Sequence, residues 1–163
     1  MDEAVPDIET EKATMAKNIA VLTRIVRNPK DKAAQNGSLS ADFAMVGLHD
    51  TAWKTAQTTG ALAYMPYTES QRYADIYGSQ QDFLVEQGKI LEDEAQFLGA
   101  MTKTDFGHGD ITPEMASLAL EPFGVWRQHL LYLGLMAKVT AATDKAFLEG
   151  KEAPTSMAEK ISN

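Results

Sequence analysis

The sequence predicts an all-α fold, an antiparallel helical bundle of about four to five helices with one long central helix. Three observations lead to this prediction: a seven-residue repeat of adjacent apolar pairs, helical spacing of apolar residues near the N-terminus, and a proline-led helix start at Thr112-Pro113-Glu114. Residues seven apart share one face of an α-helix, so the repeat predicts one helix over residues 69–101 with a single buried stripe. The repeated pairs are Ile76-Tyr77, Phe83-Leu84, Ile90-Leu91 and Phe97-Leu98.

The first helix is expected over residues 6–27. Pro6 suits the first turn, because the N–H that proline lacks would have no helical partner there. Acidic residues cluster near the start of this segment, while Arg24 and Arg27 lie near its end, as the helix dipole favours. The apolar stripe of this helix is expected to consist of Ile8, Met15, Ile19, Leu22 and Val26.

The stretch that follows is less regular. Residues 28–40 contain a proline and a glycine and are read as frayed helix followed by loop. Residues 41–49 alternate apolar with other side chains, which suits an extended segment lying against the bundle. Asp50 offers an N-cap for a short helix over residues 51–63. Small residues such as Gly60 on one face of that helix would allow close approach to a neighbour.

Capping signals indicate the ends of the longer helices. Residues 68–71 read Thr-Glu-Ser-Gln, a capping box that would open the long helix. Pro122 is expected to break or kink the helix that starts at Pro113, so the last helix is expected over residues 122–148. Gly150 is its expected C-terminal cap. The inward-facing residues of this last helix are expected to be Trp126, His129, Leu133, Met136, Thr140 and Phe147.

Length and composition favour a single domain over residues 1–150, followed by a polar tail over residues 151–163. A hydrophobic fraction of 44% is ordinary for a globular chain. The chain has no cysteine, which excludes disulfides, thiolate metal sites and a cysteine nucleophile. The net charge of −8 repels phosphate backbones and anionic lipid headgroups, so no nucleic-acid partner is expected.

No run in the sequence approaches the roughly 20 apolar residues of a membrane span. The first residues, Met1-Asp2-Glu3, lead directly into the first helical pattern. This start suits a domain whose membrane anchor has been trimmed, and it equally suits an ordinary soluble protein. The expected localisation is therefore extracytoplasmic, on the periplasmic side of the membrane, if an anchor was trimmed, and cytoplasmic otherwise.

No metal site, cofactor or catalytic residue is expected. A di-iron bundle needs Glu-x-x-His on two helices, and none of His49, His108 and His129 follows a glutamate at that spacing. The segment 105–110 carries two carboxylates and an imidazole and could hold a cation, but a glycine-rich helix connection is the favoured interpretation. The acidic run over residues 92–94 is expected to be a solvated face.

His129 lies on the apolar face of the last predicted helix, between Trp126 and Leu133. One interpretation makes it a haem ligand or an internal acid–base group. The other makes it a partly buried histidine that is bonded to a neighbouring polar group, and this second interpretation is favoured.

An aromatic cluster is the candidate ligand site. Its members lie across the junction of the short and the long helix: Trp53, Tyr64, Tyr67, Tyr73 and Tyr77. Aromatic side chains with polar tips line small-molecule pockets. They also plug the ends of helical bundles while their hydroxyls reach water. Both interpretations remain open, and the plug is favoured.

The segment over residues 50–83 resembles a group of uncharacterised bacterial proteins that carry a short N-terminal hydrophobic anchor before a helical domain. The matching positions are Trp53, Ala56, Thr59, Gly60, Ala61, Leu62, Met65, Tyr73, Tyr77 and Gln80. The resemblance implies a single-span membrane protein whose helical domain lies outside the cytoplasm. It implies no enzymatic activity.

The favoured function is a non-catalytic structural or interaction domain, the extracytoplasmic part of a small membrane-anchored bacterial protein. Its expected association is with a second copy of itself or with another protein, and it would reach a membrane only through an anchor absent from this chain. The alternative is a helical sensor module that binds a small ligand at the aromatic cluster. An enzyme is the least favoured of the three hypotheses.

Overall fold

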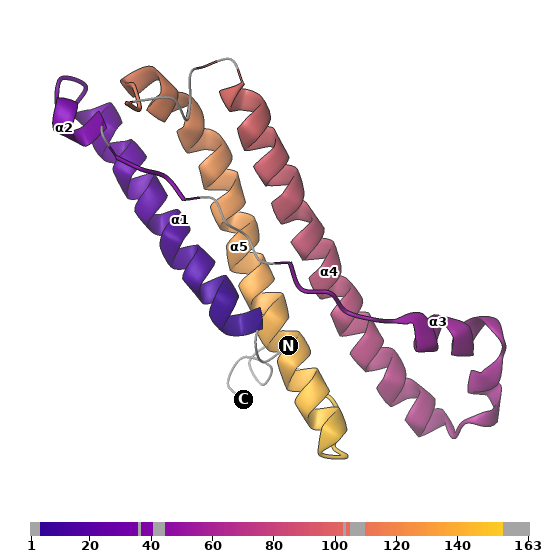
Figure 1. Ribbon diagram of the computed structural model, residues 1–163. Coiled ribbons are helices and arrows are strands. Elements are labelled where there is room, and N and C mark those ends of the chain that lie inside the picture. The colour runs from indigo at the N-terminus through magenta and orange to yellow at the C-terminus, as the bar shows by residue number, and fades with distance from the viewer. Residues whose placement is uncertain (1–3, 36, 41–44, 103, 105–109, 155–163) are drawn as a thin grey trace. The chain divides into compact units, whose positions relative to one another are not determined.

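The structure, a computed structural model, describes residues 4–35, 37–40, 45–102, 104 and 110–154, and these residues form helices without any strand. The all-α prediction is confirmed. The elements are α1 (Ala4–Arg27), α2 (Lys32–Gln35), α3 (Thr51–Thr58), the 3-10 helix η1 (Ala61–Tyr64), α4 (Tyr67–Met101) and α5 (Pro113–Leu148) (Figure 1).

The contacts of the chain group into two compact units, whereas the sequence suggested one domain over residues 1–150. The first unit comprises Met1–Pro6, Met45–Gln87 and Leu133–Asn163, and the second comprises Asp7–Ala44 and Gly88–Tyr132. Each of the two long helices therefore contributes one half to each unit. Within the predicted tail, residues 151–154 are not helical, and residues 155–163 lie outside the described part of the chain.

In the first unit, the N-terminal half of α4 runs antiparallel to the C-terminal half of α5. Arg72 donates a hydrogen bond to the carbonyl of Phe147 at 3.2 Å, and the hydroxyl of Thr140 donates to the carbonyl of Ser79 at 3.0 Å. Positions that rise along α4 thus meet positions that fall along α5, as an antiparallel pair requires.

The second unit shows the same direction of pairing between the other two halves. The imidazole of His129 lies 2.6 Å from the carboxylate of Asp93, and the ring centroids of Phe97 and Phe123 lie 4.6 Å apart. The packing of the two long helices is therefore antiparallel in each unit taken separately.

The seven-residue repeat of α4 is buried along one line only. The first member of every pair is buried: Ile76, Phe83, Ile90 and Phe97. The second members are half-buried at Tyr77 and Leu84, and Leu91 and Leu98 are 42% and 53% exposed. Successive residues on a helix lie about 100° apart, so when one line points at the centre of the core, the adjacent line lies at its edge. The predicted stripe of four apolar pairs is therefore corrected to the first member of each pair.

The buried stripe of α1 also differs from the prediction. Ile8, Met15 and Leu22 are buried as expected, but Ile19 is half-buried and Val26 is exposed. Their places in the core are taken by the preceding residues, Asn18 and Ile25. A spacing of alternately three and four residues follows the helix face more closely than the predicted set did. Asn18 was not predicted to be buried, because its side chain is polar.

Two buried amides hold the segment between α2 and α3. In the second unit, Asn18 donates to the carbonyl of Ser40 and accepts from its N–H, at 2.6 and 3.2 Å. In the first unit, Gln87 accepts from the N–H of Val46 at 2.9 Å and donates to its carbonyl at 3.0 Å. These side chains replace the hydrogen bonds that a neighbouring strand would supply to non-helical backbone. Residues 41–44 of the predicted extended segment lie outside the described residues.

The N-terminus of α5 agrees with the start predicted from the sequence, but the predicted break at Pro122 is wrong. The hydroxyl of Thr112 accepts a hydrogen bond from the N–H of Met115, which confirms the predicted N-cap. However, α5 continues through Pro122 without interruption. Proline removes one backbone hydrogen bond, and burial of Ala119 and Phe123 on either side favours continuation of the helix.

The C-terminus of α5 is capped as predicted. Gly150 has φ of +71°, a conformation that favours glycine. Its N–H donates to the carbonyl of Phe147 at 3.0 Å, and the N–H of Lys151 donates to the carbonyl of Ala146 at 2.8 Å. These two bonds form a Schellman motif.

The predicted start of α4 and the predicted end and N-cap of α3 are wrong. α4 begins at Tyr67, two residues before the expected start, so Thr68 lies inside its first turn and is not an N-cap. α3 ends at Thr58, and the side chain of Asp50 makes no capping hydrogen bond at its start. Gly60 has φ of +72°, and a Cβ there would meet no atom within 4 Å. This glycine therefore turns the chain between α3 and η1, and does not serve close helix packing.

Replacing Ile90 by alanine is expected to lower the free energy of unfolding by about 2–5 kcal/mol, because its side chain is fully buried. Leu91→Ala, in the same apolar pair, is the matched control and is expected to cost less than about 1 kcal/mol. Urea denaturation followed by circular dichroism measures both. Equal losses would contradict the assignment of the buried line.

Gln87→Met keeps the length of a buried side chain but removes both hydrogen bonds to Val46. The N–H of Val46 is then expected to exchange with solvent about tenfold faster, because its local opening is no longer opposed by the amide. Hydrogen exchange measured by NMR reads this residue directly. Gln81→Met, on the exposed side of α4, is the control and leaves the exchange of Val46 unchanged.

Candidate functional site

Three of the five predicted aromatic residues come together in the first unit. Tyr73 and Tyr77 lie one helical turn apart on α4, so they share a face. Trp53 of α3 lies across both. Its ring centroid is 5.1 Å from that of Tyr77 with planes 9° apart, and 6.4 Å from that of Tyr73 with planes 29° apart. These are stacked arrangements, which aromatic pairs favour when offset.

An apolar hollow of about 140 Å³ lies beside these rings, and we call it the aromatic pocket. It is lined by Ala52, Trp53, Ala56, Leu62, Met65, Tyr73 and Tyr77. α3 supplies the alanines and the tryptophan, η1 and the residue after it supply Leu62 and Met65, and α4 supplies the tyrosines. No residue of α3 is fully buried. The pocket is therefore open to solvent and is not part of a closed core.

The other two predicted residues do not join this cluster. Tyr64, the last residue of η1, is 92% exposed, and Tyr67, the first residue of α4, is 78% exposed. Neither lines the aromatic pocket. Sequence proximity to Trp53 suggested the wrong members, because the turn at Gly60 and the 3-10 helix after it change the direction in which these side chains leave the chain.

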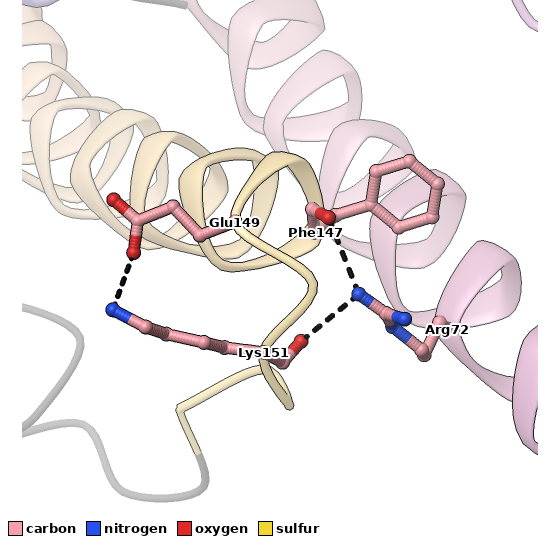
Figure 2. Close-up of polar contacts among 4 residues, drawn as sticks. All are labelled: Arg72, Phe147, Glu149 and Lys151. Carbon is pink, nitrogen blue, oxygen red and sulfur yellow. Dashed lines mark hydrogen bonds and ion pairs between the residues drawn. The ribbon is translucent and has the colours of Figure 1, made fainter.

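Arg72 adds a cation next to the aromatic cluster. Figure 2 shows its side chain reaching from α4 to the last turn of α5, where Nη2 donates to the carbonyls of Phe147 and Lys151 at 3.2 and 3.4 Å. The guanidinium carbon lies 5.4 Å from the centroid of the Phe147 ring. The negative end of the helix dipole of α5 stabilises a cation at this place. Tyr73 also packs on Phe147, with ring centroids 5.1 Å apart.

A second hollow, of about 380 Å³, adjoins Arg72, and we call it the Arg72 hollow. It is lined by Thr68, Glu69, Arg72, Tyr73, Phe147, Leu148 and Gly150. Tyr73 lines both this hollow and the aromatic pocket. Sequence reasoning missed Arg72, because its hydrogen-bond acceptors are backbone carbonyls 75 and 79 residues away, and main-chain acceptors leave no residue-type signal.

The cap of α5 also perturbs a carboxyl group. The ammonium of Lys151 donates a hydrogen bond to Glu149 at 2.6 Å (Figure 2). This hydrogen bond, and then the charge of Lys151, lower the pKa of Glu149 below its usual value of 4.5, with a smaller contribution from the charge of Lys145. Glu149 lies on the surface, so the effect is local to the cap.

His129 has the polar neighbour that was favoured for it. Its Nδ1 lies 2.6 Å from Oδ2 of Asp93. Asp93 is only 4% exposed, so the expectation of a fully solvated acidic run over residues 92–94 is wrong at its central residue. A buried carboxylate requires a donor, and His129 supplies one. The pair thereby links α4 to α5 in the second unit.

The predicted cation-binding alternative falls mostly outside the structure. Residues 105–109 of that segment are not described, and Asp110 is exposed. Across the described ranges, no group of three or more metal-ligating side chains of histidine or acidic type occurs. Within the same ranges, none of the helices combines the length and the apolar character needed to cross a membrane.

Comparison with known proteins finds no matching family model, no matching curated protein and no matching solved structure.

Lys151→Met is expected to raise the pKa of Glu149 back toward its usual value, because the hydrogen bond and the charge that lower it are both lost. NMR titration of the side-chain carboxyl carbon measures this shift. Lys145→Met removes only the smaller charge effect and is expected to raise the pKa less. The reverse ranking would contradict the assigned causes.

The same pair makes a small pH-dependent contribution to stability. The folded-state pKa of Glu149 is lowered, so its contribution is present above the unfolded pKa and is lost as the pH falls through the folded pKa. The free energies of unfolding of the wild type and of Lys151→Met are therefore expected to differ more at pH 7 than at pH 2.

Proposed function

We propose that this protein is a non-catalytic helical interaction domain that captures a single apolar group of a partner in the aromatic pocket. The observation that carries the proposal is the stack of Trp53 on Tyr77 beside a hollow of about 140 Å³. A cavity of about 150 Å³ accommodates a benzene ring. Pockets for whole cofactors or drug-sized ligands usually span about 300–1,000 Å³. The size therefore supports one aromatic ring or one branched aliphatic side chain.

The lining supports the same class of ligand. Its members are aromatic rings, a methionine, a leucine and two alanines, and methionine adapts to differently shaped apolar groups. The residue types that dominate binding energy at protein interfaces include tryptophan, tyrosine and arginine. Trp53 stacks on Tyr73, and Arg72 is the residue before Tyr73 on α4.

A location outside the cytoplasm is a further part of the proposal. It is supported by the resemblance over residues 50–83 to anchored bacterial proteins. On this view the domain is held at a bacterial membrane by an anchor and presents the aromatic pocket to a protein partner or to another copy of itself. Fusion of alkaline phosphatase to the C-terminus of the full gene product tests the location, because this reporter is active only outside the cytoplasm. An inactive but intact fusion would exclude it.

The pocket itself is tested by the fluorescence of Trp53. The chain has two tryptophans, so Trp126→Phe leaves Trp53 as the only reporter. N-acetyl-phenylalanine amide and N-acetyl-leucine amide are the neutral probes, and saturable changes in emission are expected as they enter the pocket. Ala56→Leu fills the pocket and is expected to weaken binding about tenfold or more.

Gln57→Leu is the matched control for this substitution. It adds the same side chain to α3 at an exposed position that does not line the aromatic pocket. Unchanged affinity in Gln57→Leu and lost affinity in Ala56→Leu support the proposal. Equal affinities in both variants, or no saturable change with either probe, would overturn it.

A further inference from the structure

We propose that the Arg72 hollow receives a carboxylate, so that the ligand of this protein combines an apolar group with a nearby negative charge. This inference rests on the proposed function, since the apolar group occupies the aromatic pocket. It adds the chemical class of the ligand and names Arg72 as the residue that recognises its charge.

Arg72 has hydrogen-bond donors that no described residue of the protein accepts. A guanidinium carries five N–H groups. Nη2 donates to the carbonyls of Phe147 and Lys151, and Nη1 makes no hydrogen bond to any described residue. The Nε–H also has no hydrogen-bond partner, and it is buried. A buried donor without an acceptor is costly. An entering carboxylate offers several lone pairs, and arginine binds carboxylates through two parallel hydrogen bonds.

Arg72 also lacks a counter-ion within the part of the chain that the structure describes. Among the described residues, no carboxylate forms an ion pair with Arg72, although Glu69 and Asp75 lie three positions before and after it on α4. The carboxylate of Asp75 accepts instead from Gln71, at 3.2 Å. In a chain of net charge −8, a guanidinium without an acidic partner beside a hollow is positioned for an external anion.

The aromatic pocket and the Arg72 hollow share a wall. Tyr73 lines both the aromatic pocket and the Arg72 hollow. A group that fills the aromatic pocket therefore lies one side chain away from the guanidinium. The hollow of about 380 Å³ has room for a carboxylate with part of its hydration shell.

The first experiment compares two probes that differ only in charge. N-acetyl-phenylalanine carries a carboxylate where N-acetyl-phenylalanine amide carries a neutral amide. The acid is expected to bind about tenfold more tightly, as read by the emission of Trp53 in the Trp126→Phe background. Equal affinity of the two probes would overturn the inference. The proposed function would still stand if both probes lose affinity in Ala56→Leu.

The variant Arg72→Lys separates recognition of charge from a purely structural role of Arg72. Arg72→Lys keeps the charge but loses the planar fork. It is expected to weaken the acid about tenfold and leave the amide unchanged. If Arg72 only caps α5, the acid and the amide would change together, and the inference would fail.

Glu69→Gln provides a test that leaves Arg72 in place. It removes a carboxylate from the lining of the Arg72 hollow and is expected to tighten binding of the acid severalfold without affecting the amide. Glu92→Gln makes the same change at an exposed position of the second unit and is the control. No difference between these two variants would count against the inference.

Two sources could supply this chemistry, and a last comparison distinguishes them. 3-Phenylpropionate represents a free amphipathic carboxylate, and N-acetyl-Ala-Ala-Phe represents the C-terminus of a peptide. Tighter binding of the peptide identifies a chain terminus as the ligand, and equal affinity identifies the free acid; either supports carboxylate recognition. Binding of neither would overturn it.

Discussion

One constraint determines the rest of the structure: a line of apolar residues spaced seven apart on an α-helix must be buried against neighbouring elements. In α4 this line is Ile76, Phe83, Ile90 and Phe97, and it is buried throughout. Its first two members belong to one compact unit and its last two to the other. In each unit the same helix runs antiparallel to part of α5, so a single sequence repeat organises both.

Burial of the helix faces also buries some polar residues, and each of these requires a hydrogen-bond partner. Asn18, Gln87 and Asp93 are almost fully buried, and each bonds to a group distant in sequence. An unpaired polar group in a core is costly. Any arrangement that breaks these contacts is therefore disfavoured. The two amides hold the backbone of Ser40 and of Val46, and Asp93 pairs with the imidazole of His129. Polar residues at core positions thereby specify one arrangement within each unit.

The candidate site lies beside α3, which contributes little to the core. α3 contributes no fully buried residue, and it reaches α4 through half-buried side chains, chiefly Trp53. Few buried apolar contacts imply a low local cost of opening. Binding surfaces are often drawn from such regions, because groups committed to a core cannot also meet a ligand. Arg72 is likewise not fully committed to the fold, because its bonds to the end of α5 leave part of its donor capacity unused.

The sequence alone determined the helical class, the proline-led start of α5, its glycine cap and the extent of the long helix to Met101, because these depend on local spacing and local backbone chemistry. Only the tertiary structure decided which member of each apolar pair is buried, since both members are equally apolar. It also selected Tyr73 and Tyr77 over Tyr64 and Tyr67, buried Asp93, and set Arg72 against main-chain carbonyls of α5. The physical reason is common to all of these: they depend on partners many residues away, and residue type does not record the position of a distant partner.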